Sequence, residues 1–235
     1  MDNVGKISRE ADGHIAIQTV VGPDGKPRYI VELPGVQAWS LVDHPQDVGG
    51  AVSSEQLQSS AYTRAIRKAM EQAGIPEGAD VMLVGHSLGG IAAMDLAGDP
   101  SFNGGKYNVT HVMTAGSPIS TKEVAPGAQT RVLSVENTHD IVTHVDGQDS
   151  MRYGQSERRM TYQFSDNYGS FGANHAANRE ESVKGHRGYA EHIRDDLKNS
   201  PNPYLRSYVD STTPYLRGTV TDTKIYSLRD NPPGA

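Results

Sequence analysis

The sequence predicts an α/β fold: a mostly parallel central sheet flanked by helices, with an N-terminal antiparallel hairpin. Three observations predict it. Short uninterrupted apolar runs, such as Val81–Val84, are typical of parallel strands buried on both faces. Helical segments alternate with these runs along the chain, as in βαβ units with right-handed crossovers. Near the N-terminus, two β-rich runs flank a Pro-Asp-Gly turn, which favours a hairpin.

The hairpin is expected from His14–Val20 and Arg28–Leu33, at one edge of the sheet. Its second strand ends at Pro34-Gly35. A helix should follow, because Ser53 and Gln56 have the spacing of a capping box and the next apolar residues recur on one helical face.

The remaining elements follow from periodicity and from glycine and proline stops. Further strands are expected at Asn108–Ala115, Arg131–Val135, Met160–Phe164 and Lys224–Leu228. Further helices are expected at Ile91–Ala97, Gly188–Asn199 and Pro203–Val209. Residues 165–183 are polar and read as irregular.

The 235 residues fit one domain, expected over 14–230, with a flexible segment at 1–13 and a disordered tail at 231–235. A mean hydropathy of −0.55 predicts a polar surface. The net charge of −6 gives no electrostatic reason to expect nucleic acid as a partner. Cysteine is absent, which excludes disulfides and thiolate chemistry.

No apolar run is long enough to span a membrane, and the first twenty residues lack the pattern of a signal peptide. We therefore expect a soluble protein, either cytoplasmic or secreted as part of a larger one. Transient contact with a membrane surface and further domains in a longer chain both stay open.

The strongest functional motif is Gly85-His86-Ser87-Leu88-Gly89, which matches Gly-x-Ser-x-Gly between a buried strand and a helix. Strand, tight turn and helix in this order predict a nucleophile elbow, with Ser87 held at the carboxyl end of the strand. The alternative is an ordinary turn in which Ser87 only caps the helix.

A serine nucleophile requires a histidine base, and the histidine requires a carboxylate to orient it. In this architecture the acid should follow a later strand. Asp140 meets that condition, just past Arg131–Val135, and Asp146 is the alternative. For the base we favour His186, in a glycine-flanked loop that leads into a helix, with His175 and His192 as alternatives.

Two backbone amides should form the oxyanion hole. One is expected from Leu88, directly after the nucleophile. The other is expected from Val36 or Gln37, in the loop that Pro34-Gly35 opens.

The elbow, the Leu33-Pro34-Gly35 turn, Asp140-Ile141-Val142 and His186-x-x-Tyr189 together resemble α/β-hydrolase esterases and lipases. The likeness spans roughly residues 28–195 and is greatest to class 3 lipases and inositol-deacylase-like enzymes, particularly actinobacterial ones. It implies an α/β-hydrolase fold, Ser87 as nucleophile, Asp140 as acid and His186 as base. The chain departs from a fat-splitting lipase in having few large apolar residues and no long apolar lid segment.

The sequence therefore predicts a serine carboxylic-ester hydrolase that works through an acyl-enzyme, without metal or organic cofactor. The substrate is expected to be a small-molecule or lipid ester. Alternatives are an acyltransferase or thioesterase with the same triad, or a non-catalytic binding domain. In a secreted bacterial toxin effector, the charged run at 155–159 would be a candidate contact surface.

Overall fold

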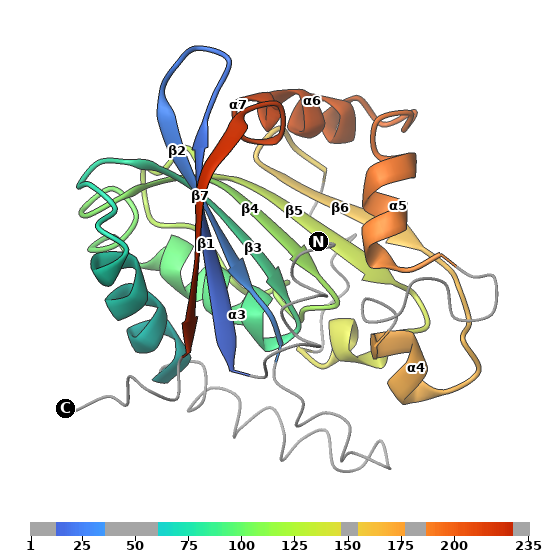
Figure 1. The fold of residues 1–235 in the computed structure, drawn as a ribbon. Helices are drawn as coiled ribbons and strands as arrows, with labels where there is room; N and C mark the ends of the chain where they lie inside the picture. Colours follow the sequence, from blue (N-terminus) through green and yellow to red (C-terminus); the bar gives the residue numbers. More distant parts are fainter. Residues whose placement is uncertain (1–12, 36–60, 147–154, 177–186, 228–235) are drawn as a thin grey trace.

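A computed structural model describes residues 13–35, 61–146, 155–176 and 187–227, and these residues are organised around one seven-stranded sheet (Figure 1). The spatial order of the strands is β6-β5-β4-β3-β2-β1-β7. In chain order the strands are β1 (His14–Val21), β2 (Pro27–Leu33), β3 (Asp80–His86), β4 (Asn108–Ala115), β5 (Arg131–Asn137), β6 (Arg159–Phe164) and β7 (Thr219–Ser227).

The sheet is parallel from β2 to β6 and antiparallel where β1 pairs with β2 and with β7. The predicted α/β fold with an N-terminal hairpin is confirmed. The expected edge position of the hairpin is wrong, because β7 returns from the end of the chain and pairs along β1, with His14 opposite Ser227. The strand expected at Lys224–Leu228 is this edge strand and begins earlier, at Thr219.

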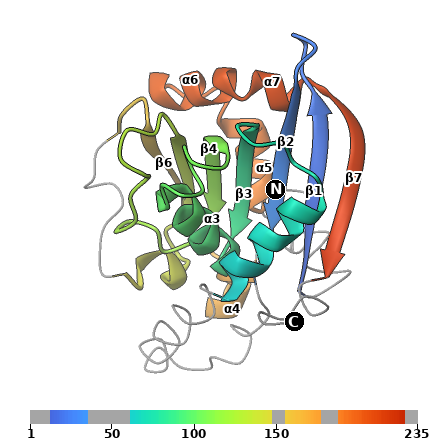
Figure 2. The same ribbon diagram turned by 90° about the vertical axis from the view of Figure 1, so that its left-hand side faces the viewer.

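Helices cover both faces of the sheet (Figures 1 and 2). On one face lie α3 (Leu88–Gly98) and a helix over residues 61–72, and on the other lie α5 (Tyr189–Asp196), α6 (Pro203–Ser211) and α7 (Thr213–Leu216). Two short helices, η3 (Ile141–His144) and α4 (Phe171–Ala176), lie near the carboxyl ends of the central strands. None of the helices in the described ranges has the length and apolar character needed to cross a membrane.

Two apolar clusters form the core, one on each face of the sheet. The first joins α3 and residues 61–72 to the strands through side chains such as Ile66, Met70 and Met94. The second joins α5 and α6 to the opposite face through Tyr189 and Tyr208. Because the central strands are buried on both faces, they read in sequence as nearly continuous apolar runs. This two-faced α/β arrangement, with its N-terminal hairpin, is an α/β-hydrolase fold.

His111 links β4 to the helices on the second face. Its Nδ1 lies 2.9 Å from Thr110 Oγ1, and its Nε2 lies 2.9 Å from Ser211 Oγ. Burial, reinforced by the positive charge of Arg131, lowers the pKa of His111 to about 4. The folded protein therefore holds this ring neutral at a pH where the unfolded chain would protonate it.

Acid should weaken the fold through His111. Between pH 6.5 and about 4 the unfolded state binds this proton and the folded state does not, so stability is lost as pH falls through that window. The loss should reach roughly 2 to 3 kcal/mol by pH 4.5. Thermal unfolding at pH 7 and pH 4.5 measures it. His111→Gln, which cannot titrate, should show a smaller decrease between the two pH values, and an equal decrease would contradict the assignment.

Candidate active site

Ser87 occupies the turn between β3 and α3 with φ 54° and ψ −126°. Among the described residues it is the only non-glycine residue with positive φ. Such a conformation costs about 1–3 kcal/mol and persists only where the surrounding structure enforces it. The Ser87 side chain makes no hydrogen bond that caps α3. The geometry is that of a strained elbow, and the structure does not support the alternative in which Ser87 is a simple helix cap.

Glycine is required on both sides of the turn because α3 passes very close to the strands. A Cβ on Gly89 would lie 1.9 Å from the carbonyl oxygen of Leu33, and a Cβ on Gly85 would lie 2.5 Å from the backbone of Gly89. Side chains at either position would push the helix away from β2 and β3. The two glycines of the motif thus set the height of Ser87 above the sheet.

Three side chains from distant parts of the chain meet at this turn. His175 Nε2 lies 3.0 Å from Ser87 Oγ, and His175 Nδ1 lies 2.9 Å from Asp140 Oδ2. Ser87, His175 and Asp140 are 2%, 6% and 0% exposed, so these contacts are shielded from water. The imidazole has one nitrogen on the hydroxyl and the other on the carboxylate, which is the order of contacts in a Ser-His-Asp triad.

Asp140 follows β5 and is held by three donors. Its Oδ1 accepts from the Val142 amide at 3.0 Å, and its Oδ2 accepts from the Tyr189 hydroxyl at 2.9 Å as well as contacting His175. Burial raises the pKa of this carboxyl, but the attraction of His175 and the hydrogen bonds outweigh it and leave the pKa below its ordinary value. Burial and the neighbouring Asp140 raise the pKa of Tyr189 well above 10, so its hydroxyl remains a donor.

His175 lies on α4, and its surroundings fix both the helix and the ring. The neighbouring Asn174 donates from Nδ2 to the His139 carbonyl at 3.1 Å and accepts the Tyr168 amide at 2.8 Å. The His86 ring stacks on the His175 ring with centroids 5.1 Å apart. The helix is therefore held by the loop before η3 and by Tyr168, and the imidazole is held by Asp140 and by His86 of the elbow.

Among the described residues, the histidine between Ser87 and Asp140 is His175, one of the two alternatives to the expected base His186. His186 itself lies outside the described residues. The physical reason for the difference is α4, a short helix within a polar stretch that reads as irregular in sequence. His192, the other alternative, contacts Asp166 and Asp196 instead.

Asp146, the alternative acid, is engaged elsewhere. Its Oδ2 accepts the Ser120 amide at 2.8 Å, and Asp140 has the contact with His175 that the acid requires.

The loop after β2 begins close to Ser87. A Cβ on Gly35 would lie 2.7 Å from Ser87 Cβ and 3.3 Å from Ser87 Oγ, so only glycine fits there. The Tyr62 hydroxyl donates to the Pro34 carbonyl at 2.9 Å and ties this loop to the helix at 61–72. Leu88 is buried at the first position of α3. Val36 and Gln37 lie outside the described residues.

Sequence reasoning missed the direct role of the Tyr189 hydroxyl. From the sequence, Tyr189 was named only in the His186-x-x-Tyr189 motif, and the structure adds a hydrogen bond from its hydroxyl to Asp140 Oδ2. The sequence feature that could have indicated this hydrogen bond is the position of Tyr189 at the start of a helix, where its side chain can reach the carboxyl ends of the strands. Within the described ranges, no group of three or more His, Asp or Glu side chains is arranged to hold a metal ion.

Comparison with known proteins adds one match. Residues 40–150 match the family model described as Lipase (class 3). None of the curated proteins compared with the chain matches it. The matched segment includes β3, the elbow, β4, β5 and Asp140. Over this segment, and in its overall fold, the chain is similar to lipase-type α/β-hydrolases.

Proposed function

We propose that the protein is a serine carboxylic-ester hydrolase in which Ser87 is the nucleophile, His175 the base and Asp140 the acid. The observation that carries the proposal is the pair of contacts made by the His175 ring, 3.0 Å to Ser87 Oγ and 2.9 Å to Asp140 Oδ2. The strained backbone at Ser87 and the family match support it independently.

The proposed reaction is acyl transfer through a covalent intermediate. Ser87 Oγ attacks the ester carbonyl while His175 Nε2 accepts the hydroxyl proton. Asp140 stabilises the resulting imidazolium through Nδ1. The tetrahedral adduct collapses when the bond to the alcohol oxygen breaks and His175 gives its proton to that oxygen. A water molecule, deprotonated by His175, then attacks the acyl-enzyme and releases the carboxylic acid and free Ser87.

The oxyanion would be stabilised by the Leu88 amide and by an amide of Val36 or Gln37. The first is supported by the position of Leu88 directly after the nucleophile, at the start of α3. The second is supported by the close approach of Gly35 to Ser87, which brings the start of that loop to the reacting atoms. Together the two amides would face charge that develops only in the transition state.

For the substrate we propose an ester of the lipid class, as the family match suggests, attacked near a polar headgroup rather than in bulk fat. The polar composition of the chain supports this choice. An acyltransferase or thioesterase would use the same atoms and differ only in the acceptor or leaving group.

A panel of acyl esters of graded chain length, including phospholipids and thioesters, tests the proposal on the unmodified protein. We expect ester turnover and stoichiometric labelling of Ser87 by a fluorophosphonate, located by mass spectrometry. Added alcohols should yield little transesterified product if water is the acceptor. An absence of both turnover and labelling across the panel would overturn the proposal and favour a binding domain.

A further inference from the structure

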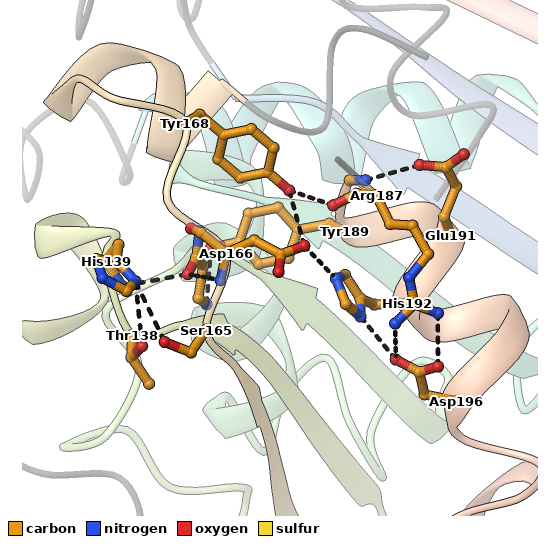
Figure 3. Close-up of polar contacts among 12 residues, drawn as sticks. Thr138, His139, Ser165, Asp166, Tyr168, Arg187, Tyr189, Glu191, His192 and Asp196 are labelled. Atoms are coloured by element: carbon orange, nitrogen blue, oxygen red, sulfur yellow. Dashed lines mark hydrogen bonds and ion pairs between the residues drawn. The ribbon is translucent and has the colours of Figure 1, made fainter. Parts of the chain in front are cut away.

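A second set of charged side chains lies between the loop after β6 and helix α5. It consists of Asp166, Arg187, His192 and Asp196, which we call the charged cluster (Figure 3). Arg187 forms two contacts with Asp196, at 2.7 and 3.1 Å. The proposed reaction does not use any of these four residues.

His192 joins the two acidic members of the cluster. Its Nδ1 lies 2.6 Å from Asp196 Oδ2, and its Nε2 lies 2.9 Å from Asp166 Oδ2. The residue is only 3% exposed. Its ring stacks on Phe164 with centroids 3.8 Å apart and an interplanar angle of 17°.

This geometry suits a doubly protonated ring. A neutral imidazole has one N–H, so with both carboxylates ionised its other nitrogen would face an oxygen lone pair. Burial raises the pKa of Asp196, but hydrogen bonds from Arg187, Tyr162 and His192 have the larger effect and bring the pKa down to about 2. Asp196 is therefore ionised at neutral pH. A cationic His192 gives the cluster two positive and two negative charges.

The tyrosines packed against the cluster also act as donors. The Tyr162 hydroxyl, from β6, donates to Asp196 Oδ2 at 2.7 Å. The Tyr168 hydroxyl donates to the Arg187 carbonyl and lies 3.5 Å from Asp166 Oδ2. Burial, together with the adjacent carboxylates, raises the pKa of both tyrosines. Both hydroxyls therefore stay neutral and add no negative charge to the charged cluster.

The cluster is connected to His175 through the loop that leads into α4. Asp166 accepts at its carbonyl from Asn137 Nδ2 at 2.8 Å and donates its amide to Asn137 Oδ1 at 3.3 Å. Two residues later, the Tyr168 amide donates to Asn174, the neighbour of His175. Holding Asp166 in place thus holds the loop whose Tyr168 amide is bonded to α4 at Asn174.

A second connection leads to Asp140. The Phe164 ring stacks on His192 and makes an edge contact with the Tyr189 ring, with centroids 5.1 Å apart in the second pair. The Tyr189 hydroxyl in turn donates to Asp140. Asn174, the neighbour of His175, and Asp140, which contacts its ring, are therefore both linked to the charged cluster.

We propose that His192 is a positioning residue for the triad: as a cation between Asp166 and Asp196, it clamps the loop before α4 to helix α5 and keeps His175 aligned with Ser87. This inference rests on the proposed function. A ring with a single N–H could donate to only one of the two carboxylates and would not clamp both elements. Misplacement of a reacting group by about 1 Å can lower a rate by roughly 100-fold.

The separate effects on kcat and KM distinguish this role from general stabilisation. His192→Gln should have a kcat roughly 10- to 100-fold lower with KM little changed, because the alignment of His175 with Ser87 is lost while the substrate site is kept. Asp166→Asn should behave alike, and the double variant should lose no more than either single variant.

Arg194→Gln is the matched control, because Arg194 is an exposed cation on the same helix whose side chain contacts Asp195. It should retain the wild-type kcat and KM. Thermal unfolding identifies the variants that fold, and if His192→Gln does not fold, the kinetic test is made on Asp166→Asn. A wild-type kcat in the folded variants, a raised KM in place of a lowered kcat, or additive losses in the double variant would overturn the inference.

Ring nitrogen shifts in the ¹⁵N NMR spectrum test the same inference without any substrate. The His192 ring should carry protons on both nitrogens at the pH of maximal kcat, or at pH 7 if no ester is turned over. A neutral ring there would overturn the inference whatever the activity. A protonated ring in a protein without Ser87-dependent turnover would instead reject the proposed function alone.

Discussion

Replacing His175 by alanine should lower kcat by roughly four to six orders of magnitude, as expected when the base of a serine triad is removed. The reason is that His175 is the histidine in contact with both Ser87 Oγ and Asp140 Oδ2. Without it, the serine hydroxyl has no acceptor for its proton and the leaving alcohol has no donor. Steady-state hydrolysis of a soluble ester measures the loss.

His186→Ala is the matched comparison, since His186 is the base that the sequence motif favoured. We expect it to retain kcat within about tenfold, a range consistent with loss of a non-catalytic contact. Thermal unfolding of both variants should be compared with the wild type to exclude misfolding. A large loss in His186→Ala together with near-normal turnover in His175→Ala would contradict the proposed triad.

Ser87 variants should separate catalysis from stability. Ser87→Ala and Ser87→Gly should both lose turnover by about six orders of magnitude, because neither supplies a nucleophile. Only glycine relieves the strain of φ 54° and ψ −126°. Ser87→Gly should therefore be more stable than Ser87→Ala by about 1 kcal/mol, or roughly 2–4 °C in Tm.

Calorimetry of the two variants, with activity assays alongside, provides this comparison. Ser101→Ala is the control, because Ser101 is exposed and lies beyond the end of α3. It should retain wild-type turnover. Equal Tm values for Ser87→Ala and Ser87→Gly would mean that the elbow carries no strain, and residual turnover in both would exclude Ser87 as the nucleophile.

The sequence predicts the elbow well because its determinants are local. A buried strand, two glycines and a helix stand next to one another in the chain, and Gly85 is required by its close contact with the backbone of Gly89 in the same motif. Asp140 could be predicted for a related reason: in a parallel sheet, acidic residues just past a strand lie at the same edge as the nucleophile. The alternation of strands and helices likewise predicts the parallel core.

His175 was harder to find because its position depends on long-range contacts. It lies 35 residues from Asp140 and 88 from Ser87, on a short helix without a strong apolar period. Its segment is held by polar contacts, among them those of Asn174, which a periodicity analysis does not register. The pairing of β7 with β1 was missed in the same way, since it joins opposite ends of the chain.

The central claim is that His175 activates Ser87, and the rate at which Ser87 reacts covalently tests it most directly. A fluorophosphonate should be added to the wild type, His175→Ala and His186→Ala, and the labelled peptide quantified over time by mass spectrometry. The account predicts rapid labelling of Ser87 in the wild type and His186→Ala, and labelling at least about 1,000-fold slower in His175→Ala. Fast labelling of Ser87 in His175→Ala would contradict it.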